Sequence, residues 1–187
     1  MVNLFKLCRS NSEKASPLKS KSPEIRLFRR EDLDRVIEIN TACLPENYSS
    51  YFYIDLFDKY PQIFLVAVVD GVVQGYVMCR MERSMSKTRR LGFARLCHVV
   101  SLAVMEPYRL RGIAMALMSQ AMENGVKYYD ATECFLEVRV SNTPAINLYN
   151  KLGFKQIRRI YGYYMNGEDA FEMARPLNEE ELVGQSE

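Results

Sequence analysis

Hydrophobic and polar positions along this chain of 187 residues repeat with two different periods. Apolar residues recur at the spacing of an amphipathic helix over residues 33–40, 51–60, 112–128 and 144–152. Extended apolar or alternating runs predict strands over residues 25–28, 63–69, 72–81, 93–104, 134–140, 154–161 and 169–174. The predicted order, β–α–α–β–β–β–α–β–α–β–β, indicates an α/β protein with a mixed sheet flanked by helices.

Short turn motifs separate these elements. Asp70-Gly71 predicts a hairpin between the second and third strands, and Asn166-Gly167 predicts a turn between the last two. At the helix over 144–152, Thr143 is the predicted N-cap, Pro144 is the first helical residue, and Gly153 lies just past the end.

A strand–helix–strand unit occupies the middle of the chain, after a predicted basic loop over residues 84–90. Such a crossover makes its two strands parallel and is right-handed in about 98% of cases. We therefore expect the strands over 93–104 and 134–140 to lie side by side and to begin at the same end of the sheet.

The two ends of the chain carry no periodic pattern. Residues 1–22, rich in Ser and Lys, are predicted to be a disordered basic tail, either purely solvated or in contact with RNA or a ribosome. Residues 23–177 are predicted to form one domain, and residues 178–187 an acidic C-terminal tail. No apolar run approaches 18 residues and no signal-peptide core is present, so we expect no membrane contact and a cytoplasmic location.

Composition narrows the chemistry. The 25 basic and 23 acidic residues leave a net charge of +2, which gives no sign of specific nucleic-acid binding. Because His98 is the single histidine of the chain, no metal site is expected. The cysteines form no C-x-x-C pair and are predicted to be reduced thiols; they are Cys8, Cys43, Cys79, Cys97 and Cys134.

The segment after Val104 is suited to binding a diphosphate. The sequence 109–114, Arg-Leu-Arg-Gly-Ile-Ala, opens the central helix, whose first-turn amides are free and carry partial positive charge. Gly112, Ile113 and the small Ala114 let a ligand approach those amides, and Arg109 and Arg111 add positive charge. The alternative is an ordinary helix start that contains a glycine.

Residues 98–153 resemble the core of the GCN5-related N-acetyltransferase superfamily. The family's pyrophosphate loop, Arg/Gln-x-x-Gly-x-Gly/Ala, matches Arg109, Gly112 and Ala114. Its second block matches Ser141-Asn142, Ala145, Leu148-Tyr149 and Gly153-Phe154. The resemblance implies a mostly antiparallel sheet and acetyl-CoA as cosubstrate without a metal. It also implies contacts of the cosubstrate with Val100, Leu102, Val104, Asn142 and Tyr149.

A narrower resemblance covers residues 24–177. Five segments resemble in sequence the catalytic subunits of archaeal and eukaryotic N-terminal acetyltransferases, most closely the archaeal ones. These segments are 44–48, 99–104, 136–142, 162–164 and 167–170. Met165 stands where that family usually has Ala, a change expected to affect only the hairpin. The resemblance implies acetylation of the α-amino group of protein N-termini, with Ser, Ala, Thr or Met as first residue.

The two crossover strands carry candidate acid–base residues. Alternation places His98 on one face of its strand with Val100, Leu102 and Val104, and it places Glu137 on one face with Phe135 and Arg139. Parallel neighbours bring Glu137 and His98 close together. Each has an ordinary alternative, a hydrogen-bonded core histidine and a structural Glu–Arg pair. The resemblance implies instead that Glu137 and His98 act together, through water, as the general base.

Acetyl transfer requires such a base. A protein α-amine has a pKa of about 7.7–8.0 and must lose a proton before it attacks a thioester. Backbone N–H groups near Val100 are suited to stabilise the oxyanion, particularly at a β-bulge. By resemblance, Tyr149 supplies a proton to the departing thiolate; its alternative role is a half-buried helix aromatic.

Two segments are predicted to form the walls of a peptide groove. Pro45 indicates a loop over residues 44–48, in which Leu44, Glu46 and Tyr48 would face the first residues of the substrate. The hairpin with Tyr163 and Tyr164 would supply the opposite wall, since tyrosines combine apolar area with a hydroxyl. A plain surface cluster of tyrosines is the alternative.

Two other functions compete with protein N-terminal acetylation. One is an enzyme of the same fold that acetylates a small amine or a lysine side chain. The other is a CoA-binding module without catalysis that associates with ribosomes. The presence of His98, Glu137 and Tyr149 favours an enzyme. The sequence leaves the oligomeric state and any auxiliary subunit open.

Overall fold

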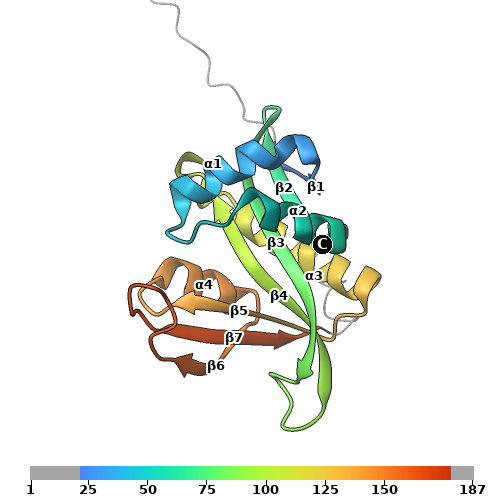
Figure 1. Cartoon of the computed structure of the whole chain (residues 1–187), viewed down its shortest axis with the longest axis vertical. Coiled ribbons are helices and arrows are strands. Elements are labelled where there is room, and N and C mark those ends of the chain that lie inside the picture. Colours follow the sequence, from blue (N-terminus) through green and yellow to red (C-terminus); the bar gives the residue numbers. More distant parts are fainter. Residues whose placement is uncertain (1–21, 178–187) are drawn as a thin grey trace, which may run out of the picture.

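Seven strands form one twisted sheet in the computed structural model, which describes residues 22–177 (Figure 1). The strands are β1 Glu24–Leu27, β2 Phe64–Val69, β3 Val72–Met85, β4 Phe93–Val104, β5 Glu133–Arg139, β6 Lys155–Ile160 and β7 Ala170–Pro176. Their order across the sheet is β1-β2-β3-β4-β5-β7-β6. Every neighbouring pair is antiparallel except β4 and β5, which are parallel. The predicted mixed, mostly antiparallel sheet is thus confirmed.

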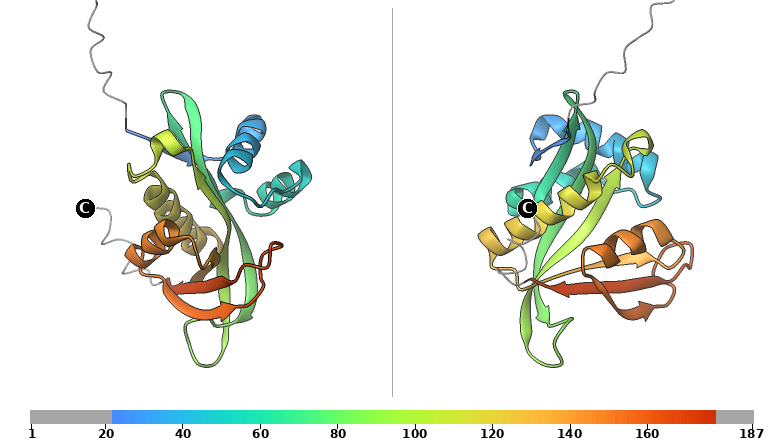
Figure 2. Two further views of the ribbon diagram at one scale, coloured as in Figure 1. Left: turned by 90° about the vertical axis from the view of Figure 1, so that its left-hand side faces the viewer. Right: turned by 180° about the vertical axis from the view of Figure 1, so that it is seen from behind.

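Helices cover both faces of the sheet (Figure 2). The α-helices are α1 Leu33–Cys43, α2 Ser50–Lys59, α3 Ile113–Tyr129 and α4 Thr143–Lys151. Helices α1 and α2 lie over one face and enclose a core that includes Val36, Ile39 and Tyr76. Helices α3 and α4 lie over the other face, where Leu117 and Phe154 are fully buried. Helix α3 is the crossover between β4 and β5.

Two local predictions were wrong. Strand β3 continues to Met85, because residues 81–85 pair with residues 93–97 of β4, so the hairpin loop spans only 86–92. Helix α4 begins at Thr143, one residue earlier than predicted, and its N-cap is therefore Asn142. The Asn142 side chain accepts the N–H of Ala145 at 3.2 Å, as an N-cap side chain does.

The predicted tails over 1–22 and 178–187 lie outside the described residues, apart from Ser22. Cys8 lies in the first of these tails. The other four cysteines are free thiols, as expected, and Cys79, Cys97 and Cys134 are buried. No helix within residues 22–177 is long and apolar enough to cross a membrane.

A β-bulge interrupts the middle of β4. Cys79 of β3 pairs with Val99, and the preceding Met78 pairs with Ser101, so Val100 has no partner. An extra residue reverses the alternation of side chains beyond it. Val100 packs against the core beneath α1 and α2, but Leu102 and Val104 pack beneath α3 and α4. The prediction that His98 shares one face with all three residues was therefore wrong for Leu102 and Val104.

Candidate active site

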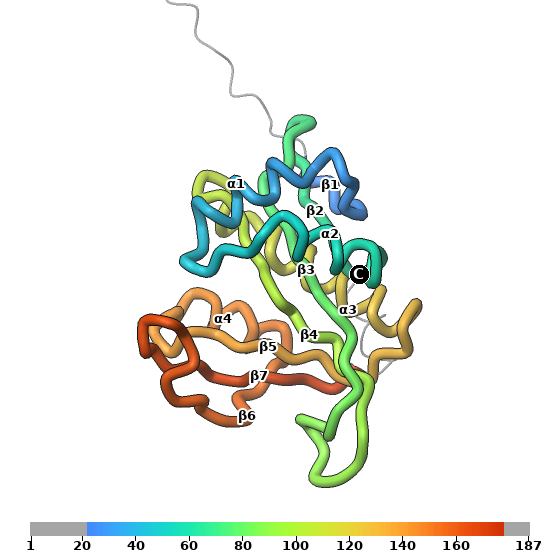
Figure 3. The backbone as a smooth tube through the Cα atoms, viewed as in Figure 1, coloured from blue at the N-terminus to red at the C-terminus, as the bar shows by residue number. Residues whose placement is uncertain are grey.

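Strands β4 and β5 separate soon after they meet. Their parallel pairing runs only from Leu96 opposite Glu133 to His98 opposite Phe135, although both strands continue further. Figure 3 shows the two chain traces diverging beyond that point. A cleft of about 1310 Å³ opens between them. Pockets for one small molecule usually measure about 300–1,000 Å³, so this cleft has room for two substrates.

The cleft brings together nearly all of the predicted site residues. Its lining includes Leu44, Glu46, Tyr48, His98, Val100, Leu102, Val104, Arg109, Gly112, Ile113, Ala114, Glu137, Asn142, Tyr149, Tyr163 and Tyr164. Arg111 is not part of this lining, because its guanidinium lies over the ring of Tyr108, 5.3 Å from the centroid. Met165 also reaches the cleft and is fully exposed at its rim, so this substitution lies at the site itself.

One end of the cleft is formed by the start of α3. Gly112 is the N-cap of α3 and has a φ of 79°, a conformation that glycine adopts without steric cost. A Cβ built on Gly112 would meet no protein atom within 4 Å, so the approach to the helix is open. Arg109 is held in place because its Nε donates to the carbonyl of Val104 at 2.9 Å. The first-turn amides of α3 have no partners within the helix, and this arrangement fits a diphosphate.

His98 is hydrogen-bonded to two carboxylates at the point where the strands part. Its Nε2 lies 2.8 Å from Glu137 Oε2, as parallel pairing of the two strands predicts. Its Nδ1 lies 2.8 Å from Glu82 Oε1, a residue of β3 that the sequence reasoning missed. The imidazole also stacks on the ring of Phe135, with centroids 4.2 Å apart. These contacts on three sides fix the position of the ring.

Glu82 is held as a carboxylate. Burial disfavours its charge, but hydrogen bonds from His98 and from Arg80, whose Nε lies 2.7 Å away, outweigh burial and lower its pKa. A signal for Glu82 exists in the sequence. Register in the β3–β4 hairpin places Arg80 directly opposite His98, and Glu82 follows two positions later on the same face. That register could not be assigned without the correct end of β3.

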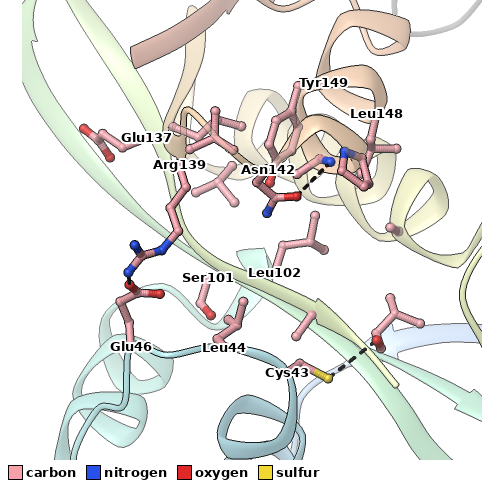
Figure 4. A pocket seen from close by; sticks show the side chains of 18 of the residues that line it. Cys43, Leu44, Glu46, Ser101, Leu102, Glu137, Arg139, Asn142, Leu148 and Tyr149 are labelled. Carbon is pink, nitrogen blue, oxygen red and sulfur yellow. Dashed lines mark hydrogen bonds and ion pairs between the residues drawn. The ribbon is translucent and has the colours of Figure 1, made fainter. Parts of the chain in front are cut away.

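Tyr149 extends from α4 toward the cleft (Figure 4). Burial, reinforced by the nearby thiols of Cys134 and Cys79, raises the pKa of its hydroxyl. The hydroxyl is therefore protonated at neutral pH. A phenol in this state can donate a proton or a hydrogen bond to an atom in the cleft.

Arg139 connects the two predicted walls of the groove. One of its guanidinium nitrogens pairs with Glu46 of the loop over residues 44–49 (Figure 4). Another pairs with Glu168 of the loop over residues 161–169 at 2.6 Å. Its guanidinium carbon lies 3.8 Å from the ring centroid of Tyr164. Glu137 and Arg139 both line the cleft, as their shared face of β5 predicts, but they pair with other residues and not with each other.

The wall carrying Tyr48 is fixed by a buried network around Asn40. The hydroxyls of Tyr53 and Tyr76 both donate to Asn40 Oδ1 at 2.8 Å. The Asn40 amide in turn donates to the carbonyl of Glu46 at 2.6 Å. Tyr48 then reaches across, and its hydroxyl donates to the carbonyl of Val100 at the bulge, 3.4 Å away. The network thus ties the 44–49 loop to the sheet, a role for Asn40 that the sequence did not reveal.

The part of the chain that the structure describes holds no group of three or more His, Cys, Asp or Glu side chains arranged to bind a metal ion.

Comparison with known proteins identifies the class to which this fold and cleft belong. A family model described as the acetyltransferase (GNAT) family matches residues 33–154. An N-alpha-acetyltransferase of Sulfurisphaera tokodaii is 48% identical over 166 residues, which cover 88% of this chain and 99% of that protein. The chain belongs to the acetyltransferase (GNAT) family. Within it, the chain is an acetyl-CoA-dependent N-alpha-acetyltransferase, as the resemblance in its sequence implied.

Solved structures agree with this assignment. Ard1 from Thermoplasma volcanium has a TM-score of 0.73 and 29% identity, over 84% of this chain and 99% of its own. Arabidopsis thaliana Naa50 was solved in complex with the bisubstrate analogue CoA-Ac-MVNAL. It has a TM-score of 0.69 and 25% identity, over 82% of this chain and 98% of its own. The predicted fold, enzyme class and cosubstrate are therefore confirmed.

Proposed function

We propose that the enzyme acetylates protein N-termini that begin with Ser, Ala, Thr or Met, and that Glu137 and His98 provide the general base. The observation that carries this proposal is the hydrogen bond between His98 Nε2 and Glu137 Oε2 inside the cleft. The cleft has a diphosphate-binding helix start at one end and the loop with Glu46 and Tyr48 at the other. Acetyl-CoA and a peptide N-terminus would therefore meet between the parted strands.

The start of α3 positions the cosubstrate in this mechanism. Amides from Gly112 to Ala114 and the charge of Arg109 bind the diphosphate. The remainder of the cosubstrate extends along β4 toward the bulge, past Leu102. This path delivers the thioester to the region where His98 and Glu137 lie. Complementary contacts fix both reactants and so lower the entropic part of the barrier.

The base acts on the α-ammonium group. Glu137 and His98, linked to the amine through water, take its proton, and the free amine attacks the thioester carbonyl. A C–N bond forms while negative charge develops on the carbonyl oxygen. The amide of Val100, which has no partner residue on β3 at the bulge, is suited to stabilise that charge. As the C–S bond breaks, the nitrogen releases its second proton to water and the protonated hydroxyl of Tyr149 donates its proton to the thiolate. Tyr149 then regains a proton from solvent.

Recognition of the first residue rests on the aromatic walls. Tyr48, Tyr163 and Tyr164 give flat, rigid contact surfaces with hydroxyl groups at their edges. Burial, together with the charge of Glu137, raises the pKa of Tyr163 to about 12, so its hydroxyl can donate to a peptide carbonyl. The preference for Ser, Ala, Thr or Met starts is supported by the resemblance to the catalytic subunits.

A peptide screen tests the proposal. Peptides that differ only in their first residue are incubated with labelled acetyl-CoA, and product is quantified by mass spectrometry. Wild type is compared with the double variant Glu137→Ala plus His98→Ala. We expect the variant to lose most turnover while it retains acetyl-CoA affinity, measured by calorimetry. Unchanged turnover would remove both residues from the mechanism.

The same screen separates the competing functions. A spermidine substrate and an N-terminally blocked peptide with one internal lysine are included as alternatives. Faster acetylation of either one would show that protein N-termini are not the principal substrates. Binding of acetyl-CoA without acetylation of any amine would identify a CoA-binding module.

A further inference from the structure

Glu82 makes a contact with His98 that the proposed mechanism has not yet used. Its Oε1 lies 2.8 Å from His98 Nδ1, on the side of the ring opposite Glu137. The same oxygen accepts from Arg80 Nε at 2.7 Å. The Glu82 side chain is about one-third exposed, and His98 is buried. Three side chains from β3, β4 and β5 thus form one chain of hydrogen bonds.

The chemistry of donors and acceptors assigns a proton to Nδ1. An ionised carboxylate can only accept hydrogen bonds, and Arg80 holds Glu82 in that form. A 2.8 Å contact with Nδ1 is therefore attractive only when this nitrogen carries hydrogen.

The opposite nitrogen is different. Nε2 and Glu137 Oε2 also lie 2.8 Å apart, so a proton that either atom accepts can be shared between them. Glu137 lines the cleft and can exchange this proton with water or with a bound amine. Proton exchange is thus confined to the Nε2 side of the ring.

We propose that Glu82 is a positioning residue, which holds His98 in the Nδ1–H tautomer and so reserves Nε2 for proton transfer with Glu137 and the substrate amine. The proposal rests on the proposed function of His98 and Glu137 as the base. It assigns the same task that a buried carboxylate performs when it orients a catalytic histidine in hydrolase triads. Glu82 itself touches no substrate.

Other charged and titratable groups face this cluster. Arg80 from β3 neutralises part of the Glu82 charge, and the Lys87 ammonium lies 4.8 Å from the centroid of the Phe135 ring that stacks on His98. The remaining groups near Glu137 or the ring are Tyr48, Cys97, Arg158, Tyr163, Tyr164 and Glu172. Only Glu82 and Glu137 form hydrogen bonds to the ring nitrogens within the described residues.

The inference can be tested directly because His98 is the chain's one histidine. The imidazole signals in a ¹⁵N–¹H NMR spectrum of untagged protein therefore belong to it alone. In wild type, we expect Nδ1 to show the chemical shift of a protonated nitrogen. In Glu82→Leu, Glu137 is the remaining acceptor, so the proton should move to Nε2.

Kinetics provide a second readout. We expect kcat of Glu82→Leu to fall by about 10- to 100-fold, the usual effect of removing a partner that orients a functional histidine. The peptide KM should be unchanged. Glu82→Gln retains the shape but loses the charge of the acceptor, which weakens the hydrogen bond from Nδ1. Its kcat should therefore fall between those of wild type and Glu82→Leu. Glu82→Gln also tests the inference if Glu82→Leu does not fold.

The control is Glu24→Gln, which removes a charge from exposed strand β1 of the same sheet. It should leave the spectrum and kcat as in wild type. An Nδ1–H ring in Glu82→Leu would overturn the inference, and so would an unchanged kcat in either Glu82 variant. Inactivity of wild type toward every peptide would instead overturn the proposed function, and the NMR result would remain interpretable.

Discussion

Glu46 and Arg139 form an ion pair across the mouth of the cleft, although 93 positions separate them in the sequence. The same guanidinium also binds Glu168 and lies over Tyr164. Arg139 therefore links the two loops that border this end of the cleft. Arg139 is well suited to this position, because its planar fork can hold two carboxylates at once.

The substitution Arg139→Lys should loosen both walls while it retains the charge. We expect the peptide KM to rise about tenfold, equivalent to about 1.4 kcal/mol, with acetyl-CoA affinity unchanged. Steady-state kinetics over peptide concentration measure this effect. The control is Arg159→Lys, which weakens an exposed pair with Asp169 and should leave KM as it is. An equal rise in both variants would contradict the assigned role.

Gly112→Ala tests the start of α3. An L-residue at this φ of 79° costs about 1–2 kcal/mol, and its Cβ projects into the open approach to the helix. Gly71, with a φ of 80° and equally open surroundings in the β2–β3 turn, provides a matched control. Both variants should lose similar stability in urea denaturation. Only Gly112→Ala should weaken acetyl-CoA binding, by about tenfold in calorimetric Kd.

Tyr149→Phe removes the proposed proton donor without changing the packing of α4. We expect kcat to fall by about 10²-fold, at the low end for general acid catalysis, while acetyl-CoA still binds. Stopped assays of CoA release measure the rate. Tyr161→Phe, which alters an exposed hydroxyl beyond β6, is the control and should retain full turnover. Normal turnover in Tyr149→Phe would leave protonation of the thiolate to another group.

Asn40→Ala should destabilise the protein. Two tyrosine hydroxyls and the carbonyl of Glu46 would lose buried partners, at a cost of about 2–3 kcal/mol in the free energy of unfolding. Urea denaturation followed by circular dichroism measures the change. The exposed Asn150 serves as control, and its change to Ala should alter stability by less than about 0.5 kcal/mol. A similar small effect at Asn40 would show that the network contributes little.

Glu133 makes stability depend on pH. Burial opposes its ionisation, but hydrogen bonds from Ser86 and from the amides of Lys87 and Thr88 outweigh burial and lower its pKa. A lowered folded pKa means that the unfolded state binds the proton more tightly. The carboxylate therefore stabilises the fold above its unfolded pKa of 4.5, and this contribution disappears as the pH falls through the lower folded value.

Glu133→Gln should accordingly reduce the free energy of unfolding by about 1–3 kcal/mol at pH 7. The difference from wild type should shrink steadily below pH 4.5, as denaturation curves at a series of pH values would show. A difference that stays constant across this range would exclude ionisation of Glu133 as its source.

Local patterns were sufficient for most of the fold. Residues 113–129 were recognisable as the crossover helix because Gly112 marks its start and apolar residues recur along it. The parallel pairing of β4 and β5 followed from that crossover, and it placed Glu137 beside His98 correctly. These inferences needed only neighbouring residues and one topological rule.

The features of the fold and the site that the sequence did not predict depend on contacts between elements that are distant in the sequence. The bulge at Val100 shifts the register between β3 and β4, and no local signal in either strand fixes such a shift. Asn40 has helical spacing in the sequence, yet its hydrogen-bond partners lie on α2, on β3 and in the loop that follows α1. The partners of Arg139 likewise lie on two distant loops. Such contacts become visible only when the chain is folded.

The early separation of β4 and β5 has a consequence for the stability of the folded state. Beyond three paired positions, the facing edges of these strands lack the ladder that joins other neighbours, so a bound molecule has backbone groups to engage. A ligand that occupies the gap at a hundredfold excess over its Kd adds about 2.7 kcal/mol to the stability of the folded state. We therefore expect resistance to heat and to proteases to increase with the concentration of the ligand that occupies this gap.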